Sequence, residues 1–287
     1  MKRIYSIAAL LLLHLTALAQ NDKVDSAKNG RGGTISILAG STETDDSTKN
    51  KKRFTLKMGH DEKKVDTSDK VFDLHIGLLD LGFNYIEDRT DYASAAAQNF
   101  LQVGDDLKNK NLFSLREGKS VNVNIYPVLI KAKLVKTKGQ RLYVTLGAGL
   151  QMYNFRFNKP VTYLNETSPV VVMDSIAFTK NKVGLTYLSV PLMVTSKTRL
   201  AKDIWLVYGA GVSAGYRIAS WTKQVSGERG KEKNHDQFNF NNFNTCVTAE
   251  VGIDGWLRLY ASYQLTPLHE NALEQYPYAI GVRFLGI

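Results

Sequence analysis

The sequence predicts an all-β protein, an eight-stranded antiparallel up-and-down transmembrane β-barrel with a mostly disordered N-terminal leader. Three observations predict it: apolar and polar residues alternate from Val71 onward, the face opposite the apolar one is polar yet rich in glycine, and long and short connections follow one another in turn. A membrane barrel requires this combination, because alternate residues of each strand meet lipid and lumen. Tight turns lie on one side of the membrane and longer loops on the other.

Eight segments carry the alternation, near residues 71–86, 119–136, 141–157, 182–197, 203–219, 244–252, 256–266 and 277–286. Several are longer than a typical strand of five or six residues, and a tilted membrane strand needs about 9–11. The first segment changes phase between Ile76 and Leu79, and the second changes phase after Pro127. Since a phase change within one strand indicates an extra residue, we expect a β-bulge in both.

The connections between these segments alternate in length. The long ones are residues 87–118, 158–181 and 220–243, the medium one is 267–276, and the tight ones are 137–140, 199–202 and 253–255. This order predicts that the long loops face outward and that both termini are periplasmic, at the cell outer membrane. A short helix is expected at Ala93–Leu101 within the first long loop.

The competing fold is a soluble β-sandwich or lipocalin-like barrel, in which the apolar face points inward. Aromatic residues gather near segment ends, as expected for interfacial girdles, and the polar face carries residues such as Asn122, Asn124, Gln151 and Glu250. A soluble sandwich has no reason to alternate long and short loops so regularly. The pattern therefore favours the membrane barrel.

The first 70 residues have a different composition. Met1-Lys2-Arg3, an apolar run and Ala17-Leu18-Ala19 are typical of a secretory signal peptide over residues 1–19. Residues 20–70 form a polar, largely disordered periplasmic leader, and residues 71–287 form the barrel. The net charge of +10 alone would suit a nucleic-acid partner, but a secretory signal argues against one. Cys246, the single cysteine, excludes an intrachain disulfide and is expected as a small buried residue of the lumen.

Four charged residues fall on the predicted lumen face. A two-residue turn at Asp254-Gly255 would put Glu250 opposite a lipid-facing residue, whereas a three-residue loop, Ile253-Asp254-Gly255 with Gly255 left-handed, puts Glu250 opposite Arg258. The predicted lumen ionic network comprises Arg217, Glu250, Arg258 and Arg283. Because an unpaired buried charge is very costly, we expect these groups to pair and to plug a lumen that side chains can fill.

These residues resemble the outer-membrane β-barrel family of Bacteroidetes known as porin-family or PorT-like proteins. The matching pieces are Gly118-Lys119-Ser120, residues 146–157, residues 187–192, residues 208–211 and the ending Pro277–Phe284. The resemblance covers about residues 71–287 and implies a cell-envelope barrel, with PorT itself linked to protein secretion and gliding. Many outer-membrane chains end on an aromatic residue, so Phe284 is the expected signal for barrel assembly.

Enzymatic and metal chemistry are weaker hypotheses. His235 and His269 each precede a carboxylate in a predicted outer loop, which is the usual arrangement of solvated neighbours, and no spacing assembles a nucleophile, base and orienting group. No catalytic residue, metal site or cofactor is predicted. The basic runs Lys49–Arg53 and Gly230–Lys233 could touch acidic lipid or polysaccharide, or could be solvated charge.

The sequence thus favours a non-enzymatic barrel with a structural or surface-interaction role through its outer loops. Expected partners are outer-membrane lipid and lipopolysaccharide, the barrel-assembly machinery, and a surface ligand or secretion partner. The alternatives are a narrow porin-like channel for small solutes and a component of a secretion or gliding apparatus.

Overall fold

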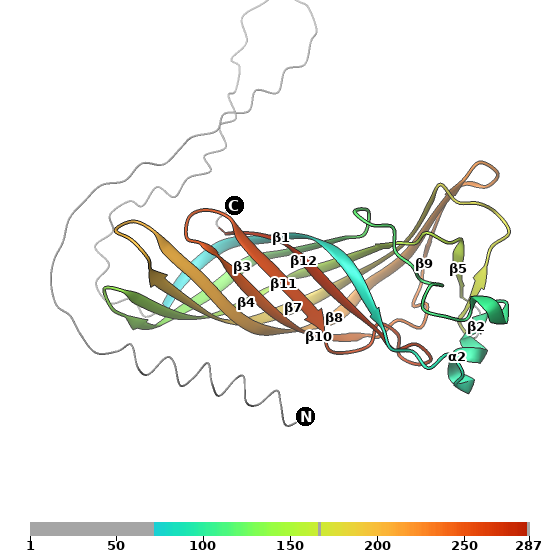
Figure 1. Ribbon diagram of the computed structural model, residues 1–287, viewed down its shortest axis with the longest axis horizontal. Coiled ribbons are helices and arrows are strands. Elements are labelled where there is room, and N and C mark those ends of the chain that lie inside the picture. The colour runs from blue at the N-terminus through green and yellow to red at the C-terminus, as the bar shows by residue number, and fades with distance from the viewer. Residues whose placement is uncertain (1–71, 166–167, 286–287) are drawn as a thin grey trace, which may run out of the picture. The chain divides into compact units, whose positions relative to one another are not determined.

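A closed ring of eight antiparallel strands forms the body of the protein (Figure 1). The computed structural model describes residues 72–165 and 168–285, so the predicted signal peptide and leader lie outside the described residues. The ring strands are β1 (Phe72–Asp88), β3 (Val121–Lys136), β4 (Gln140–Arg156), β7 (Lys180–Arg199), β8 (Trp205–Ser226), β10 (Phe243–Ile253), β11 (Arg258–Gln264) and β12 (Gln275–Leu285). No described helix has the length and hydropathy needed to cross a membrane.

Each ring strand pairs with its neighbours along the chain, and β12 pairs with β1 to close the ring. Between β8 and β10, the pairing runs from Ile253 opposite Leu206 to Phe243 opposite Tyr216. Beyond Tyr216, β8 continues as a hairpin with β9 (Gly230–His235), which lies outside the ring. The predicted eight strands and their up-and-down order are confirmed, with β8 extending to Ser226, past the predicted end at residue 219.

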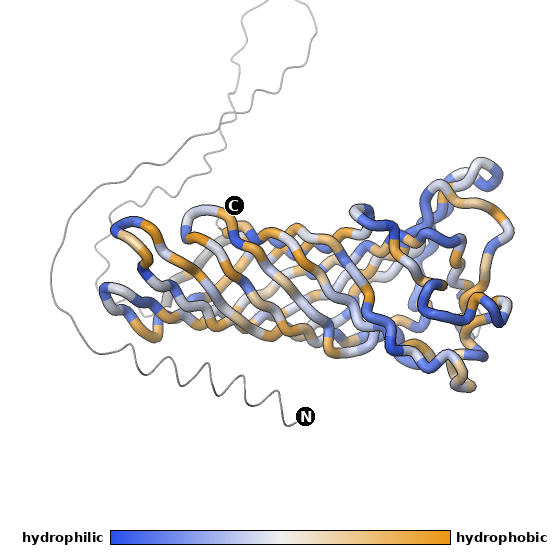
Figure 2. The backbone as a smooth tube through the Cα atoms, viewed as in Figure 1, coloured by the Kyte–Doolittle hydropathy of each residue, from blue (hydrophilic) through white to orange (hydrophobic). Residues whose placement is uncertain are grey.

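Hydrophobic and hydrophilic residues alternate along the ring strands (Figure 2), and the burial of their side chains shows that the two faces of the wall differ. Large apolar side chains are exposed on the outside, including Ile130, Leu146, Leu192, Val212, Leu259 and Ile280. Polar and charged side chains are buried inside, including Asp80, Asn122, Gln151, Ser213, Glu250 and Arg283. The wall is therefore apolar outward and polar inward, the reverse of a soluble barrel.

Glycines open space inside the wall. A Cβ at Gly281 would collide with the backbone of Leu81 and Gly82, and a Cβ at Gly82 would meet the Tyr260 hydroxyl. The bulge predicted at Pro127 is confirmed, because the β3–β4 register shifts between Ile125 and Val128. The bulge predicted in β1 is not found in its pairing with β3, where the register is unbroken: Ile76 pairs with Val128 and Leu78 pairs with Tyr126. Between them, opposite the kink in β3, Gly77 has a φ of 82°.

The turn between β10 and β11 corrects the predicted register. Gly255 is left-handed, with a φ of 74°, as expected. However, Glu250 pairs with Tyr260 and Gly252 pairs with Arg258, so the turn is centred one residue later than predicted. The loop is Asp254-Gly255-Trp256, closed by the Ile253 amide donating to the Leu257 carbonyl at 3.3 Å. The partner of each residue is therefore two positions later than predicted, and every side chain keeps its predicted face.

The long loops fold into a cap over one end of the ring. The cap contains α2 (Ala95–Phe100), the 3-10 turn η1 (Asp105–Leu107) and a small sheet of β2 (Leu101–Gln102), β6 (Val170–Met173) and β5 (Val161–Leu164). The Ser94 hydroxyl caps α2 by accepting from the Ala97 amide, which confirms the predicted helix with slightly narrower bounds. At the other end of the ring, the described connections between strands are short turns.

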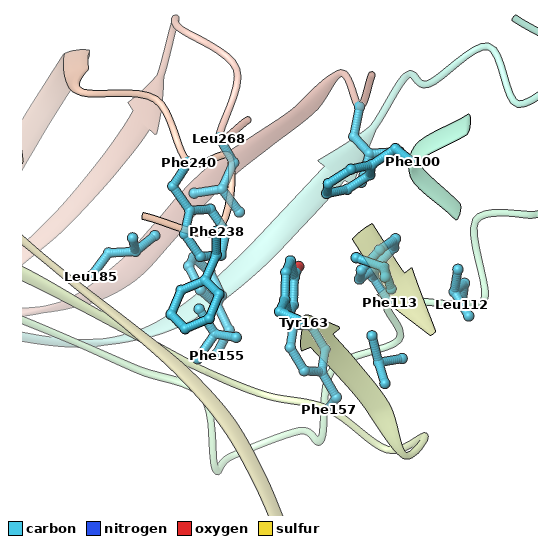
Figure 3. Packing of buried hydrophobic residues seen from close by; sticks show 14 of the residues in the cluster. Phe100, Leu112, Phe113, Phe155, Phe157, Tyr163, Leu185, Phe238, Phe240 and Leu268 are labelled. Carbon is cyan, nitrogen blue, oxygen red and sulfur yellow. The ribbon is translucent and has the colours of Figure 1, made fainter. Parts of the chain in front are cut away.

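One continuous apolar cluster joins cap and ring (Figure 3). Tyr153, Phe155 and Leu185 enter it from the ring strands, and Phe100, Phe113, Tyr163, Phe238 and Phe240 enter it from the cap. Burial of apolar surface contributes roughly 25 cal/mol for each Å² removed from water, so these rings fix the cap on the barrel mouth.

The β10–β11 register can be tested by cysteine pairing. In a Cys246→Ser background, Val251→Cys with Leu259→Cys should form a disulfide, because these residues are direct partners across the ladder. Thiol counting by mass spectrometry and migration without reductant would detect it. The matched pair Val251→Cys with Leu257→Cys, two residues out of register, should remain reduced. Cross-linking of that pair in preference to the first would favour the originally predicted register.

Candidate functional site: a charged lumen beneath an aromatic cap

A cluster of buried ion pairs fills the lumen near the short-turn end. Arg283 on β12 makes a bidentate pair with Asp80 on β1, with Nε to Oδ1 at 2.7 Å and Nη2 to Oδ2 at 2.9 Å. The two residues are direct partners in the β1–β12 ladder. Arg283 Nη1 also lies 3.3 Å from Glu250 Oε2 on β10. One arginine therefore joins two carboxylates from opposite sides of the ring seam.

The cluster continues toward the turn. Arg258 on β11 lies 3.7 Å from Glu250 Oε2 and donates to Asp254 Oδ1 at 2.9 Å, and Lys197 on β7 pairs with the same Asp254. Thr195 donates its hydroxyl to Glu250 Oε1 at 2.9 Å. The ion pairs thus join three carboxylates to three cations. Such pairing offsets the several kcal/mol that removing each ion from water costs.

The structure brings three of the four predicted network residues together and separates the fourth. Arg217 is buried but lies at the cap end, where its Nη2 donates to the Phe240 carbonyl at 3.0 Å and to Asn242 Oδ1 at 2.7 Å. Its Nη1 donates to Ser220 Oγ at 2.6 Å. Its placement in the ionic network was therefore wrong. Arg217 satisfies the carbonyls of the loop that follows β9, since that loop returns across the barrel mouth.

Sequence reasoning missed Asp80, Asp254 and Lys197 as members of the cluster. The signal for Asp80 was present: Leu79 and Leu81 are apolar residues two positions apart and therefore share the outer face, so the residue between them must point inward. Asp80 is 0 % exposed. Asp254 was predicted only as a turn residue, and no periodicity indicates that its side chain reaches back to Arg258.

A layer of neutral polar groups crosses the lumen between the ion pairs and the cap. Gln151 Nε2 donates to the Tyr126 hydroxyl at 2.8 Å and to Ser213 Oγ at 3.1 Å, and Asn244 Nδ2 donates to Gln151 Oε1 at 3.1 Å. Cys246 is buried beside this layer, with its sulfur 3.5 Å from the Tyr153 hydroxyl. The lumen therefore contains ion pairs, then amides and hydroxyls, then aromatic rings.

His269 lies at the centre of the aromatic cap. It is 1 % exposed, stacks on Tyr163 with ring centroids 6.0 Å apart, and contacts Phe240 at 4.9 Å and Phe100 at 5.6 Å. Its Nε2 shares a hydrogen bond of 3.4 Å with the Tyr163 hydroxyl, and its Nδ1 has no partner among the described residues. The expectation that His269 is a solvated loop residue was wrong.

Burial lowers the pKa of His269 to about 3, because the aromatic rings around it cannot solvate an imidazolium. The negative charge of Asp88 acts on this pKa in the opposite direction. Burial likewise raises the pKa of the Tyr163 phenol, so both ring systems are neutral at pH 7. A histidine that is neutral in the folded cap and has an ordinary pKa near 6.5 when unfolded makes the cap sensitive to acid.

The expected assembly residue, Phe284, lies on the outer face of β12 opposite Leu79. It is partly exposed, and its neighbour Arg283 points into the lumen. This position leaves the ring of Phe284 accessible from outside the wall.

Replacing Glu250 with alanine should destabilise the barrel strongly. The change leaves Arg258 and Arg283 as neighbouring buried cations with one fewer carboxylate between them. Removing one partner of a buried pair costs about 3–5 kcal/mol. Unfolding by urea in lipid vesicles would measure this loss, with the folded fraction read on a denaturing gel, where unheated folded protein migrates faster than unfolded protein. The control Glu228→Ala, at an exposed hairpin tip, should change stability by less than about 0.5 kcal/mol. Equal stabilities of the two variants would show that the ion pairs of Glu250 do not stabilise the barrel.

Acid should loosen the cap through His269. Since its folded pKa is lower than its unfolded pKa, the unfolded cap binds more protons, and cap stability falls as the pH drops from about 6.5 toward 3. The slope is at most about 1.4 kcal/mol per pH unit. Hydrogen exchange in residues 95–113, corrected for intrinsic rates, should rise between pH 7 and pH 4.5.

His269→Phe should remove most of that rise, whereas His235→Phe, which changes an exposed histidine of β9, should preserve it. If both variants respond to acid as the unmodified protein does, another group controls the cap.

The chain matches no protein-family model and no curated protein sequence. Among solved structures it is similar to "The crystal structure of Ail, the attachment invasion locus protein of Yersinia pestis". The alignment has 9% sequence identity and a TM-score of 0.24, and it covers 74% of this chain and 98% of that one. The fold assignment rests on the strand pairings described above and not on this likeness.

Proposed function

We propose that this protein is an integral outer-membrane β-barrel with a closed lumen, and that its role is non-enzymatic and is exercised through the cap. The observation that supports this most strongly is the inversion of the wall. Apolar side chains such as Leu146, Leu192 and Ile280 are exposed outside, around a lumen that contains buried ion pairs. In water this outer face would be a very large apolar patch, whereas in a bilayer it is the surface that lipid requires.

The closed ring also meets the main requirement of a membrane protein. A bilayer offers no hydrogen-bonding partner to a free strand edge, so a sheet can span it only if the ladder closes on itself. Here β1 and β12 supply that closure. The ends of the described barrel, at β1 and β12, lie at the short-turn end, which supports periplasmic termini and an outward-facing cap.

Three successive layers support a closed lumen. An ion crossing it would have to displace the Arg283–Asp80 and Arg283–Glu250 pairs, then the Gln151 layer, then the aromatic cluster. An eight-stranded barrel is just wide enough for side chains to fill it. A structural or interaction role through the cap follows more readily than transport.

A second candidate is a narrow path for small solutes. Several buried polar atoms of the lumen, Ser189 Oγ and Asn124 Oδ1 among them, have no hydrogen-bond partner in the described structure. Buried polar atoms in this position are commonly satisfied by water, and a file of water molecules would be the start of a conducting path. This observation favours the channel only if the water layer is continuous.

The resemblance to porin-family or PorT-like barrels of Bacteroidetes extends the proposal to a surface ligand or a secretion partner. The outward Phe284 would be read by the barrel-assembly machinery during insertion. Both are predictions of the sequence, and neither is needed for the barrel itself.

Two measurements on the refolded mature protein test the proposal. We expect the unheated protein to migrate faster than the boiled one on a denaturing gel and to fractionate with outer membranes, because the ring resists detergent until it is heated. In planar bilayers we expect no single-channel steps. A soluble protein without a heat-dependent shift would contradict the membrane location, and clear conductance steps would favour the channel.

A further inference from the structure

Four cations stand side by side across the outer face near the cap end of the ring. Arg156 on β4 is the direct partner of Lys182 on β7, Lys182 is the partner of Lys223 on β8, and Lys223 is the partner of Lys233 on β9. Direct partners in an antiparallel ladder point to the same face, with Cβ atoms about 4.5–5.5 Å apart. The four side chains therefore form one row, here called the cation row.

A second register position adds to the row. Lys180 and Lys231 flank Val225, two residues along from the cation row on the same face. The nearby Glu232 pairs instead with Gln224, whose side chain is buried on the opposite face. Among the described residues, no carboxylate lies within 4.0 Å of any of the four lysines Lys180, Lys182, Lys223 and Lys233.

Like charges directly opposite one another destabilise a sheet, so this arrangement has a cost. The proximity of Lys231 lowers the pKa of Lys223 below its usual range, with Lys180 and Lys233 acting in the same direction. At this point β8 has passed the end of its pairing with β10 and lies between β7 and β9. Nothing in the fold of these strands requires lysine there, since the outward positions of a rim hairpin accept any polar residue.

The position of the row relative to the apolar wall identifies the partner. On β8 the outward residues run from Val212 through Tyr216 and Ile218 to Trp221, and Lys223 follows two residues later. The Trp221 ring covers Gly184 of β7, and Lys233 Nζ lies 5.1 Å from its centroid. Tryptophan marks the membrane–water interface in such walls. The cations therefore stand where headgroups begin, roughly 7 Å along the strand from the last aromatic residue.

We propose that the cation row binds the phosphate groups of a phosphorylated glycolipid in the outer leaflet, with its acyl chains against the apolar wall below Trp221. The proposal rests on the outer-membrane location proposed above. A soluble acidic polysaccharide would also be attracted to these charges. The lipid fits better because the row continues the lipid-facing surface of the same strands and not the upper surface of the cap, which a soluble polymer would meet first.

The test uses the refolded mature protein in three kinds of vesicle: phosphatidylcholine alone, and phosphatidylcholine with bisphosphorylated or with dephosphorylated lipid A. The heat-dependent gel shift reports insertion in each. Native mass spectrometry after mild detergent extraction reports how much lipid A remains bound. The variant K182Q/K223Q/K233Q removes three charges of the row. The control K136Q/K138Q/K202Q removes three exposed lysines at the short-turn end.

We expect the unmodified protein and the control to retain bisphosphorylated lipid A in preference to the dephosphorylated form. The row variant should retain roughly a hundredfold less, about fivefold for each lysine, while it still inserts. Equal retention of both forms of lipid A by the unmodified protein would overturn the lipid site alone. So would equal retention of bisphosphorylated lipid A by the row variant and the control.

Binding of soluble dextran sulfate that depends on the row, without any preference for phosphorylated lipid, would overturn it in favour of a polysaccharide. Loss of the gel shift in every vesicle would overturn the membrane location and the lipid site together.

Discussion

Closure of the ring through the β1–β12 ladder is the constraint on which the rest of the structure depends. Once those strands pair, no ring edge is left open, and the number of strands fixes a narrow lumen. Inward side chains must then be buried whatever their polarity. Asp80 and Arg283 sit within the closing ladder itself and are direct partners there. The same contact that closes the ring therefore begins the ion cluster, and Glu250 on β10 extends it from Arg283 to Arg258 on β11.

The sequence was sufficient to predict those parts of the fold that depend on the alternation of side chains between the two faces of a strand. Alternation identified all eight ring strands and put Glu250, Arg258 and Arg283 inside and Ile280 outside, because successive residues of a strand must point to opposite faces. The alternating connection lengths predicted that the long loops lie together at one end of the ring, where the structure has the cap. The bulge at Pro127 was also predictable, since proline cannot donate to the ladder.

What could not be predicted lies where the period of two gives no information. A register that differs by two residues preserves every face, so alternation cannot distinguish Glu250 opposite Arg258 from Glu250 opposite Tyr260. Arg217 has the right parity for the lumen, but it stands at the bulge around Ile218, where β8 rises toward the cap. The cap itself depends on contacts between loops far apart in the chain, such as Phe113, Tyr163 and His269, and no local pattern of residues records them.

The distal part of β8 joins the two surfaces on which the proposals depend. Its inward residues Thr222, Gln224 and Ser226 are buried, and Gln224 donates to Thr162 of β5 at 2.7 Å, which ties the strand to the cap. Its outward residues Trp221 and Lys223 belong to the interface and to the cation row. Because alternate residues of one extended strand serve both surfaces, a lipid phosphate held by the lysines would act on the same backbone that carries the cap. Arg217 holds the base of this extension by donating to the Phe240 carbonyl, so the hairpin cannot tilt outward without breaking contacts of the aromatic cluster. The same segment of β8, beyond the end of its pairing with β10, therefore holds both the cap and the cation row in position.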